Sequence, residues 1–324
     1  MFGELPKLFD RNFVIGFFLP VAIFVIFSLL IVSPYAFGAL AIDFLKTDLL
    51  AGTTAIGLGL FAWVGGIILL AINRDLYRFM EGYGKYNPLK LLRVFGWMEK
   101  RRYRKAVKEL EKLDDEYREC IRLHQKFPVE SNTKRNEVMR QLAEEFPDEE
   151  KHLLPTPFGN VLRSFEIYPR VMYGFEAIDG WGRVLAVIPK DYLELIDAAR
   201  AQVDFWVNLG VVFILLQIEY ISLAFITWTP MKEWVVLLFI ALGTLAPLRA
   251  TSSAREWGDF VKSAFDIYRF DLLESLGIDI PKTREEEREL WTEYSQAIIY
   301  RLPETLPALK NSANKPASKK ATSK

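Results

Sequence analysis

Charged side chains are missing from two long stretches near the start of this sequence, Asn12 to Ile42 and Leu49 to Asn73. A helix needs roughly 20 apolar residues to cross the hydrocarbon core of a bilayer. An amphipathic helix at the surface of a soluble protein keeps a polar face, which these stretches lack. They exclude an ordinary soluble protein and predict an integral membrane protein.

Cysteine and histidine are also scarce, since the chain contains only Cys120, His124 and His152. One cysteine excludes a disulfide within the chain, and a zinc site needs three or four ligands, so we expect no metal centre. The motifs of nucleotide-binding loops, serine hydrolases and zinc proteases are absent as well. We therefore predict no catalytic residue and no cofactor, and an enzyme is the least favoured class.

Net charge excludes another group of functions. The 41 Lys and Arg residues balance the 41 Asp and Glu residues, so the whole chain has no field that would attract nucleic acid or an acidic partner. Any electrostatic function must come from local charge clusters.

Four apolar segments are long enough to cross a membrane, although the last is short and contains Pro247 near its end. Trp206, Trp228 and Trp234 fall at the ends of the last two segments, where indole rings favour the membrane–water interface. The predicted spans are residues 13–33, 49–72, 205–228 and 234–248.

The distribution of Lys and Arg predicts the orientation of these spans. Only Lys46 lies between the first two spans and only Lys232 between the last two, whereas five basic residues follow the second span by residue 93. Positive residues are retained on the cytoplasmic side, so both termini are expected there. The predicted fold is an all-α integral membrane protein with four transmembrane helices as two hairpins (1–73 and 205–249), mainly helical cytoplasmic regions (74–204 and 250–305) and a disordered lysine-rich tail (306–324).

A basic segment follows the first hairpin. Between Arg74 and Lys108 there are 11 basic and 3 acidic residues. Anionic lipid headgroups are the natural partner of such a cluster beside a membrane, although positive-inside topology alone would also produce it. No nucleic acid is expected, because no recognition fold accompanies the charge. The residues expected to contact lipid are Lys100, Arg101, Arg102, Arg104 and Lys105.

An apolar seam with heptad spacing runs from Ala106 to Phe127, where Pro128 ends it. The seam either pairs with a second amphipathic run at 138–146 in the same chain or pairs two protomers. Small residues four apart in the second span predict close helix packing, against the first span or against another copy. A homo-oligomer would use Ala55, Gly59, Leu110, Leu113 and Tyr117.

Local signals predict several further elements. Thr156 followed by Pro157 predicts a helix start and Pro169 its end. Glycines at 180 and 182 interrupt the helical period, and residues 184–188 are the best candidate for a short strand or interfacial segment. A helix that opens after Pro189 can run without interruption into the third span. Thr283 with a glutamate three residues later predicts a capped final helix.

Residues 154–204 resemble a group of uncharacterised bacterial integral membrane proteins. The resemblance is carried by the string Pro155-Thr156-Pro157-Phe158-Gly159-Asn160-Val161-Leu162-Arg163 and by Tyr168-Pro169, Tyr173-Gly174, Trp181 and Pro189. It implies a bacterial cytoplasmic (inner) membrane and a shared juxtamembrane fold. It implies no activity and supplies no catalytic residue.

Glu219 is the sharpest candidate site, because it lies near the middle of the third span. A charged carboxylate there costs a few kcal/mol, so it should be protonated, partnered or hydrated. Asn208 returns to nearly the same helix face, and Gln217 and Ser222 are close in sequence. This polar stripe either forms an ion or proton path or joins helices through hydrogen bonds, with Gln217, Ser222 or Thr244 as the partner of the acid.

Two classes of function follow. The first is a non-enzymatic, membrane-anchored helical scaffold or sensor that acts through its cytoplasmic region on a cytosolic protein or on anionic lipid. The alternative is an oligomeric channel or pore-forming effector with Glu219 in the path. Most of the chain outside the spans is cytoplasmic in this topology, which favours the first class.

Overall fold

The computed structural model describes residues 10–32, 52–85, 87–228 and 230–307. Over these residues the protein is helical and contains no strand, which confirms the predicted all-helical class. The helices are α1 (Arg11–Phe13), η2 (Val14–Phe18), α2 (Leu19–Phe27), η3 (Ser28–Val32), α5 (Gly52–Glu81), α6 (Pro88–Leu91), α7 (Val94–Arg122), α8 (Val129–Glu145), η4 (Glu150–His152), α9 (Pro157–Tyr173), α10 (Ala177–Leu185), α11 (Lys190–Thr227), α12 (Glu233–Leu276), α13 (Arg284–Tyr300) and η5 (Pro303–Thr305).

Four helical segments of the described chain are long and apolar enough to cross a membrane: Arg11–Leu30, Ala55–Glu81, Lys190–Thr227 and Glu233–Leu276. Each overlaps one of the four predicted spans, and the last two helices extend well beyond the predicted bounds of 205–228 and 234–248. The first combines α1, η2, α2 and η3, and its π-helical turn ends just before Pro20, which has no backbone N–H to donate. The predicted Lys46 connection and lysine-rich tail lie outside the described residues.

The chain divides into two compact units. The first contains residues up to Phe165 together with Glu194–Phe260, and the second contains Glu166–Leu193 together with the chain from Val261. Helices α9, α11 and α12 each contribute residues to both.

In the first unit, α5 packs against the first apolar helix through small residues. A Cβ atom on Gly66 would lie 3.2 Å from the backbone nitrogen of Phe18, and one on Gly65 would lie 2.7 Å from Val21. Ala62 and Gly66 of the close-packing face predicted for the second span are therefore used inside the chain, against the first span. Phe13, Phe17, Val21, Ala62 and Leu69 form the buried cluster of this pair.

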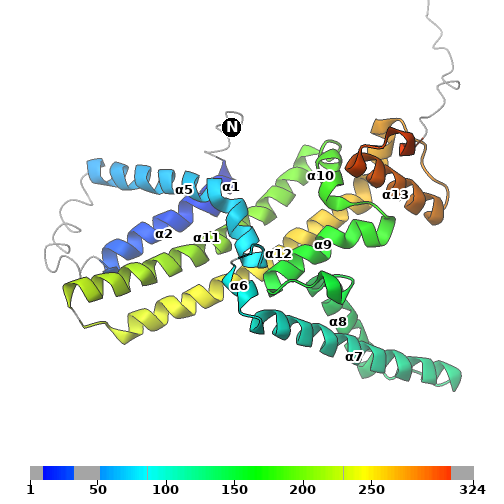
Figure 1. The fold of residues 1–324 in the computed structure, drawn as a ribbon, viewed down its shortest axis with the longest axis horizontal. Helices are drawn as coiled ribbons and strands as arrows, with labels where there is room; N and C mark the ends of the chain where they lie inside the picture. The colour runs from blue at the N-terminus through cyan, green and yellow to red at the C-terminus, as the bar shows by residue number, and fades with distance from the viewer. Residues whose placement is uncertain (1–9, 33–51, 86, 229, 308–324) are drawn as a thin grey trace, which may run out of the picture. The chain divides into compact units, whose positions relative to one another are not determined.

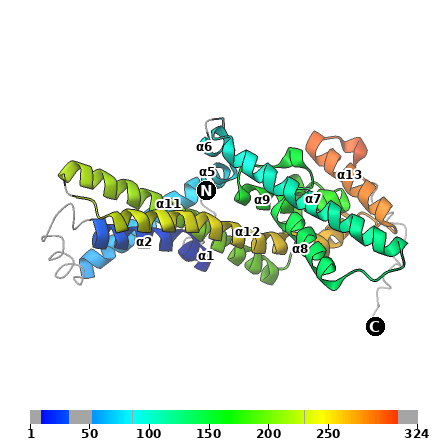
Figure 2. The same cartoon turned by 90° about the horizontal axis from the view of Figure 1, so that it is seen from below.

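Helices α11 and α12 form the other large apolar cluster of this unit. Leu209, Val212, Phe213, Leu216 and Tyr220 of α11 pack with Val235 and Phe239 of α12. Side chains of α2, among them Ile23 and Phe27, cover the cluster. Figures 1 and 2 both show α2, α11 and α12 side by side.

Helices α7 and α8 lie against each other beyond the end of α5. Their small core contains Ala106 and Leu113 of α7 and Val138 of α8, with Leu110 and Leu142 partly buried beside them. The seam therefore pairs with α8 in the same chain. The helix is shorter than predicted, because α7 ends at Arg122 and His124 takes a left-handed backbone conformation with φ of 53°.

The second unit is organised around aromatic rings. Phe175 stacks on Trp291 with ring centroids 4.3 Å apart, and both side chains are fully buried. A Cβ atom on Gly180 would lie 2.4 Å from the Phe175 ring, so only glycine allows this approach.

Two local predictions for this part of the chain are wrong. The candidate strand after Gly180 begins inside a helix, α10, because Gly180 makes room for the Phe175 ring rather than breaks the helix. Pro169 lies inside α9, which continues to Tyr173 and ends at Gly174 with φ of 80°. The starts after Thr156 and Thr283 are correct, and α11 does run from Lys190 through the third span.

Candidate functional site

Glu219 binds the first span. The Ser28 hydroxyl donates a hydrogen bond to Oε1 of Glu219 at 2.7 Å, and Oε2 is buried with no partner among the described residues. None of the predicted partners is used. Ser222 is exposed, the Thr244 hydroxyl donates to the backbone oxygen of Ala241, and Gln217 forms no hydrogen bond with Glu219 in the described chain. Ser28 is one of the few polar residues in the first charge-free stretch, and this was the available signal.

Asn208 also binds the first span. This side chain is fully buried, and its Nδ2 donates to the backbone oxygen of Gly16 at 2.8 Å. Its Oδ1 is buried with no partner in the described chain. Asn208 and Glu219 therefore share the face of α11 that meets the first apolar helix, as the helical period predicts. Each is already engaged with a specific group of that helix.

A third polar contact of α11 was not identified from the sequence. Asp204 is only 5% exposed as a residue. Its Oδ1 atom accepts hydrogen bonds from Asn73 Nδ2 at 2.9 Å and from the Tyr77 hydroxyl at 2.7 Å. The Arg200 guanidinium lies 4.0 Å from its other oxygen. The spacing of four residues from Asn208 was a signal for this contact, since it places both side chains on one helix face. Asp204 joins α11 to α5, as Asn208 joins it to η2.

The predicted lipid-contact residues on α7 divide into two groups. Arg102 pairs with Glu99 and with Glu145, and Arg104 forms two hydrogen bonds to Glu150, the shorter at 2.6 Å. These guanidinium groups hold α7 against neighbouring segments. By contrast, Lys100, Arg101 and Lys105 form no ion pair with any described residue. The structure thus keeps three of the five predicted cations available.

Exposed apolar side chains precede these cations directly. They surround the start of α7 and include Trp97, which is 58% exposed and has the Arg101 guanidinium 5.3 Å from its ring centroid. Large exposed apolar residues next to exposed cations are unusual on a surface that faces only water. The apolar members are Leu91, Leu92, Val94, Trp97 and Met98. Together with Lys100, Arg101 and Lys105 they are called the α7 surface below.

The segment before α9 fixes α7 in place. Asn160 is fully buried, and its Nδ2 donates to Glu99 Oε2 at 2.9 Å and to the backbone oxygen of Leu154. Thr156 caps α9 by accepting from the Gly159 N–H, and its hydroxyl donates to the backbone oxygen of Met80 at 2.7 Å. The string from Pro155 to Arg163 therefore contains residues that connect α5, α7 and α9, which is a structural task.

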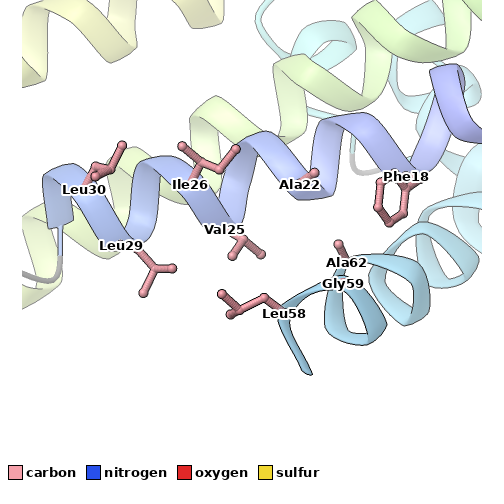
Figure 3. Close-up of a pocket in the computed structure, with 9 residues that line it drawn as sticks. All are labelled: Phe18, Ala22, Val25, Ile26, Leu29, Leu30, Leu58, Gly59 and Ala62. Carbon is pink, nitrogen blue, oxygen red and sulfur yellow. The ribbon is translucent and has the colours of Figure 1, made fainter. Parts of the chain in front are cut away.

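Of the residues predicted to mediate self-association, two are covered within the chain. Leu113 is buried against α8 and Leu110 is partly buried there, while the Tyr117 ring contacts Phe127. Ala55 is exposed. Gly59 opens onto an apolar cavity of about 260 Å³ between the first and second apolar helices, shown in Figure 3. A Cβ atom on Gly59 would meet no atom within 4 Å, so the tight contact predicted at this glycine does not form within the chain.

A polar cluster of the second unit lies outside the predicted spans. The Tyr173 and Tyr168 hydroxyls donate to the Asp266 carboxylate, at 2.7 Å and 3.1 Å. Burial raises the pKa of both tyrosines, and the Asp266 charge adds to this effect. Arg269 pairs with Glu287 at 2.6 Å. Because each charge has a partner, we interpret this cluster as a structural connection between α9, α12 and α13.

Among the described residues, one group of ligand atoms fits the spacing of a metal site. Atoms of Asp148, Glu149 and His152 lie within 4.8 Å of one another. The group is at the surface, and His152 Nδ1 lies 2.8 Å from Asp148, which already accounts for its position. It gives no reason to revise the prediction that the protein has no metal centre.

No family model, curated protein or solved structure matches this chain. Its function must therefore be argued from the residues themselves.

Proposed function

We propose that this chain is a multi-pass protein of a bacterial cytoplasmic membrane, a helical scaffold or sensor that acts through its cytoplasmic region and binds anionic lipid with the α7 surface. The four apolar helices form two hairpins in this proposal, and both termini are cytosolic. An unidentified cytosolic protein would be the other partner of the helical region.

Helix directions support this topology. Asn208 contacts Gly16, and Glu219 contacts Ser28, so residue numbers rise together along α11 and the first apolar helix. The two helices therefore run parallel, as the first and third spans of two hairpins must. Gly66 packs beside Phe17 and Phe18, and Val21 beside Gly65, which fits an antiparallel first pair.

The observation that carries the proposal is the α7 surface. It combines exposed apolar side chains with three unpaired cations and directly follows α5 and α6, where the second span would leave the membrane. Aromatic and aliphatic side chains enter the headgroup region, and each nearby Lys or Arg adds about 1 kcal/mol of attraction to an anionic leaflet. Both contributions act on the same short segment.

The channel alternative is supported less well. Glu219 accepts from Ser28 and Asn208 donates to Gly16, so both side chains hold helices together. Hydrogen bonds between helices are the common use of such residues inside a membrane.

The proposal can be tested with a fluorophore at position 98. Met98→Cys in a Cys120→Ser background is labelled in the full-length protein and placed in nanodiscs, which leave both membrane faces open to acrylamide. We expect nanodiscs with phosphatidylglycerol to reduce quenching relative to phosphatidylcholine alone. Replacement of Lys100, Arg101 and Lys105 by Gln should remove that difference.

A matched control uses basic residues farther along α7. Lys112, Arg118 and Arg122 are exposed and form ion pairs within their own helix, so their replacement by Gln should leave the lipid-dependent protection unchanged. Equal quenching in both lipid compositions would show that the α7 surface does not bind anionic lipid.

A further inference from the structure

The strongest additional feature is a cavity of about 360 Å³ in the first unit. This volume is within the range of about 300–1,000 Å³ typical of small-molecule sites. Its lining comes from α5, α6, α7, α9, α11, α12 and the residues just before α9. Aromatic side chains and glycines are prominent in this lining: Phe79, Phe95, Phe158, Trp206, Gly210 and Gly243.

The cavity offers an occupant almost no hydrogen-bonding group. Three threonines contribute to its lining, and each hydroxyl already donates to a backbone oxygen: Thr156 to Met80, Thr244 to Ala241 and Thr251 to Pro247. The remaining lining is apolar or aromatic, apart from glycine. A polar ligand would lose its hydration here without replacement, so the chemistry selects a hydrocarbon group.

Glycines create this space between α11 and α12. A Cβ atom on Gly243 would meet no atom within 4 Å, and one on Gly210 would meet only Ala246 at 3.5 Å. Both glycines lie in the charge-free parts of the two helices, whereas Trp206 lies at their cytoplasmic end in the proposed topology. The cavity thus extends from the headgroup level into the hydrocarbon layer.

A positive charge lies at the headgroup end. The Arg249 guanidinium is 5.4 Å from the centroid of the Trp206 ring, and the residue is exposed and forms no ion pair within the described chain. Lys90 directly follows the lining residue Leu89, and Arg93 lies two residues before the lining residue Phe95. An apolar space with cations at one end matches the two parts of an anionic lipid.

We propose that this cavity binds one acyl chain of an anionic phospholipid, with the phosphate near Arg249. The inference rests on the proposed membrane placement and deepens it, because it adds a specific lipid site to the α7 surface. The groove in Figure 3 makes a useful contrast. It is lined only by apolar residues and glycine, so nothing there would select one headgroup over another.

The test counts lipids that remain on the purified full-length protein by native mass spectrometry, with added phosphatidylglycerol or phosphatidylcholine. We expect one phosphatidylglycerol molecule to be retained at lower lipid concentration than phosphatidylcholine. Gly243→Phe should fill the cavity and abolish retention of both lipids. Arg249→Gln should keep retention but reduce the preference for phosphatidylglycerol about fivefold, the factor that corresponds to about 1 kcal/mol.

Gly57→Phe is the matched control, because a Cβ atom on Gly57 also meets no atom within 4 Å and this residue lies outside the cavity. It should retain lipid like the unmodified protein. Full retention by Gly243→Phe would overturn the site, and an unchanged headgroup preference in Arg249→Gln would overturn the role of the arginine. The Gln variant of Lys100, Arg101 and Lys105 should still retain the lipid, so failure of the α7 surface and failure of the cavity are distinguishable.

Discussion

Two helix pairs in this protein are built alike inside and differently outside. Helices α7 and α8 enclose Ala106, Leu113 and Val138, and α11 and α12 enclose a larger set that includes Leu216 and Phe239. The outer face of the first pair carries ion pairs such as Lys134–Glu109, with 2.5 Å between the charged atoms. The outer face of the second pair carries exposed isoleucine, leucine and phenylalanine: Ile214, Ile218, Phe225, Leu237 and Ile240.

This difference shows that the interior of a helix pair does not reveal its solvent. Apolar contacts fill both interiors, and the α7–α8 pair gains stability by removing apolar surface from water. If lipid surrounds α11 and α12, their apolar residues lose no water on packing, and dispersion contacts and hydrogen bonds must hold the pair. Asn208 and Glu219 of α11 form such hydrogen bonds, although their partners lie on the first apolar helix and not on α12.

The largest expected effect on stability comes from replacing one buried leucine by alanine in each pair. Leu113→Ala should destabilise the α7–α8 pair by about 2–5 kcal/mol, since it loses both burial and packing. Leu216→Ala, although its side chain is fully buried, should cost about 2 kcal/mol less, because three CH₂ groups at about 0.8 kcal/mol each are not returned to water.

Hydrogen exchange of the full-length protein in nanodiscs would compare the two effects. The amides of α8 report on Leu113→Ala, and the amides of α12 report on Leu216→Ala. Faster exchange of more than tenfold is expected in α8 and a clearly smaller change in α12. Equal acceleration in the two pairs would contradict a lipid environment around α11 and α12.

A smaller effect concerns the polar contact between α11 and the first apolar helix. Glu219→Gln keeps an acceptor for Ser28 and should leave thermal stability unchanged, whereas Glu219→Leu should lose about 0.6 kcal/mol, the average for such bonds in a membrane. A double-mutant cycle with Ser28→Ala measures the coupling. If Glu219→Gln instead removes ion flux from reconstituted vesicles while the fold is intact, the channel alternative becomes the better one.

The same contrast explains what the sequence could predict. Charge-free stretches and the helical period identified four apolar helices, the α7 seam and the shared face of Asn208 and Glu219, because these are properties of one helix. A period gives the face of a helix but not the helix that will cover it. Ser28 and Gly16, which bind Glu219 and Asn208, therefore followed only from the structure.

Local signals failed at two positions, and at one of them a contact with another residue explains the failure. Gly180 normally favours a break, yet it lies inside α10 because the Phe175 ring occupies the place of its side chain. Pro169 normally ends a helix, yet α9 continues past it to Gly174. The α7 surface was predicted only in part, because the sequence shows five cations but not that Glu145 and Glu150 neutralise Arg102 and Arg104.

The smallest expected effect is on the ion pairs outside α7 and α8. The hydrogen bond and charge of Lys134 lower the pKa of Glu109, and Arg104 does the same for Glu150. A carboxyl group whose pKa is lowered in the folded state stabilises that state at any pH above the ordinary pKa of the group. This contribution disappears as the pH falls through the folded-state pKa. The protection of amides in α7 and α8, measured relative to their intrinsic exchange rate at each pH, should therefore fall slightly below pH of about 4.5. Salt at 1 M, where the screening length is about 3 Å, should weaken the same pairs at neutral pH.

The amides of α11 between Val207 and Tyr220 serve as the internal control. If they respond to salt as strongly as those of α8, the separation between a water-facing and a lipid-facing pair is wrong.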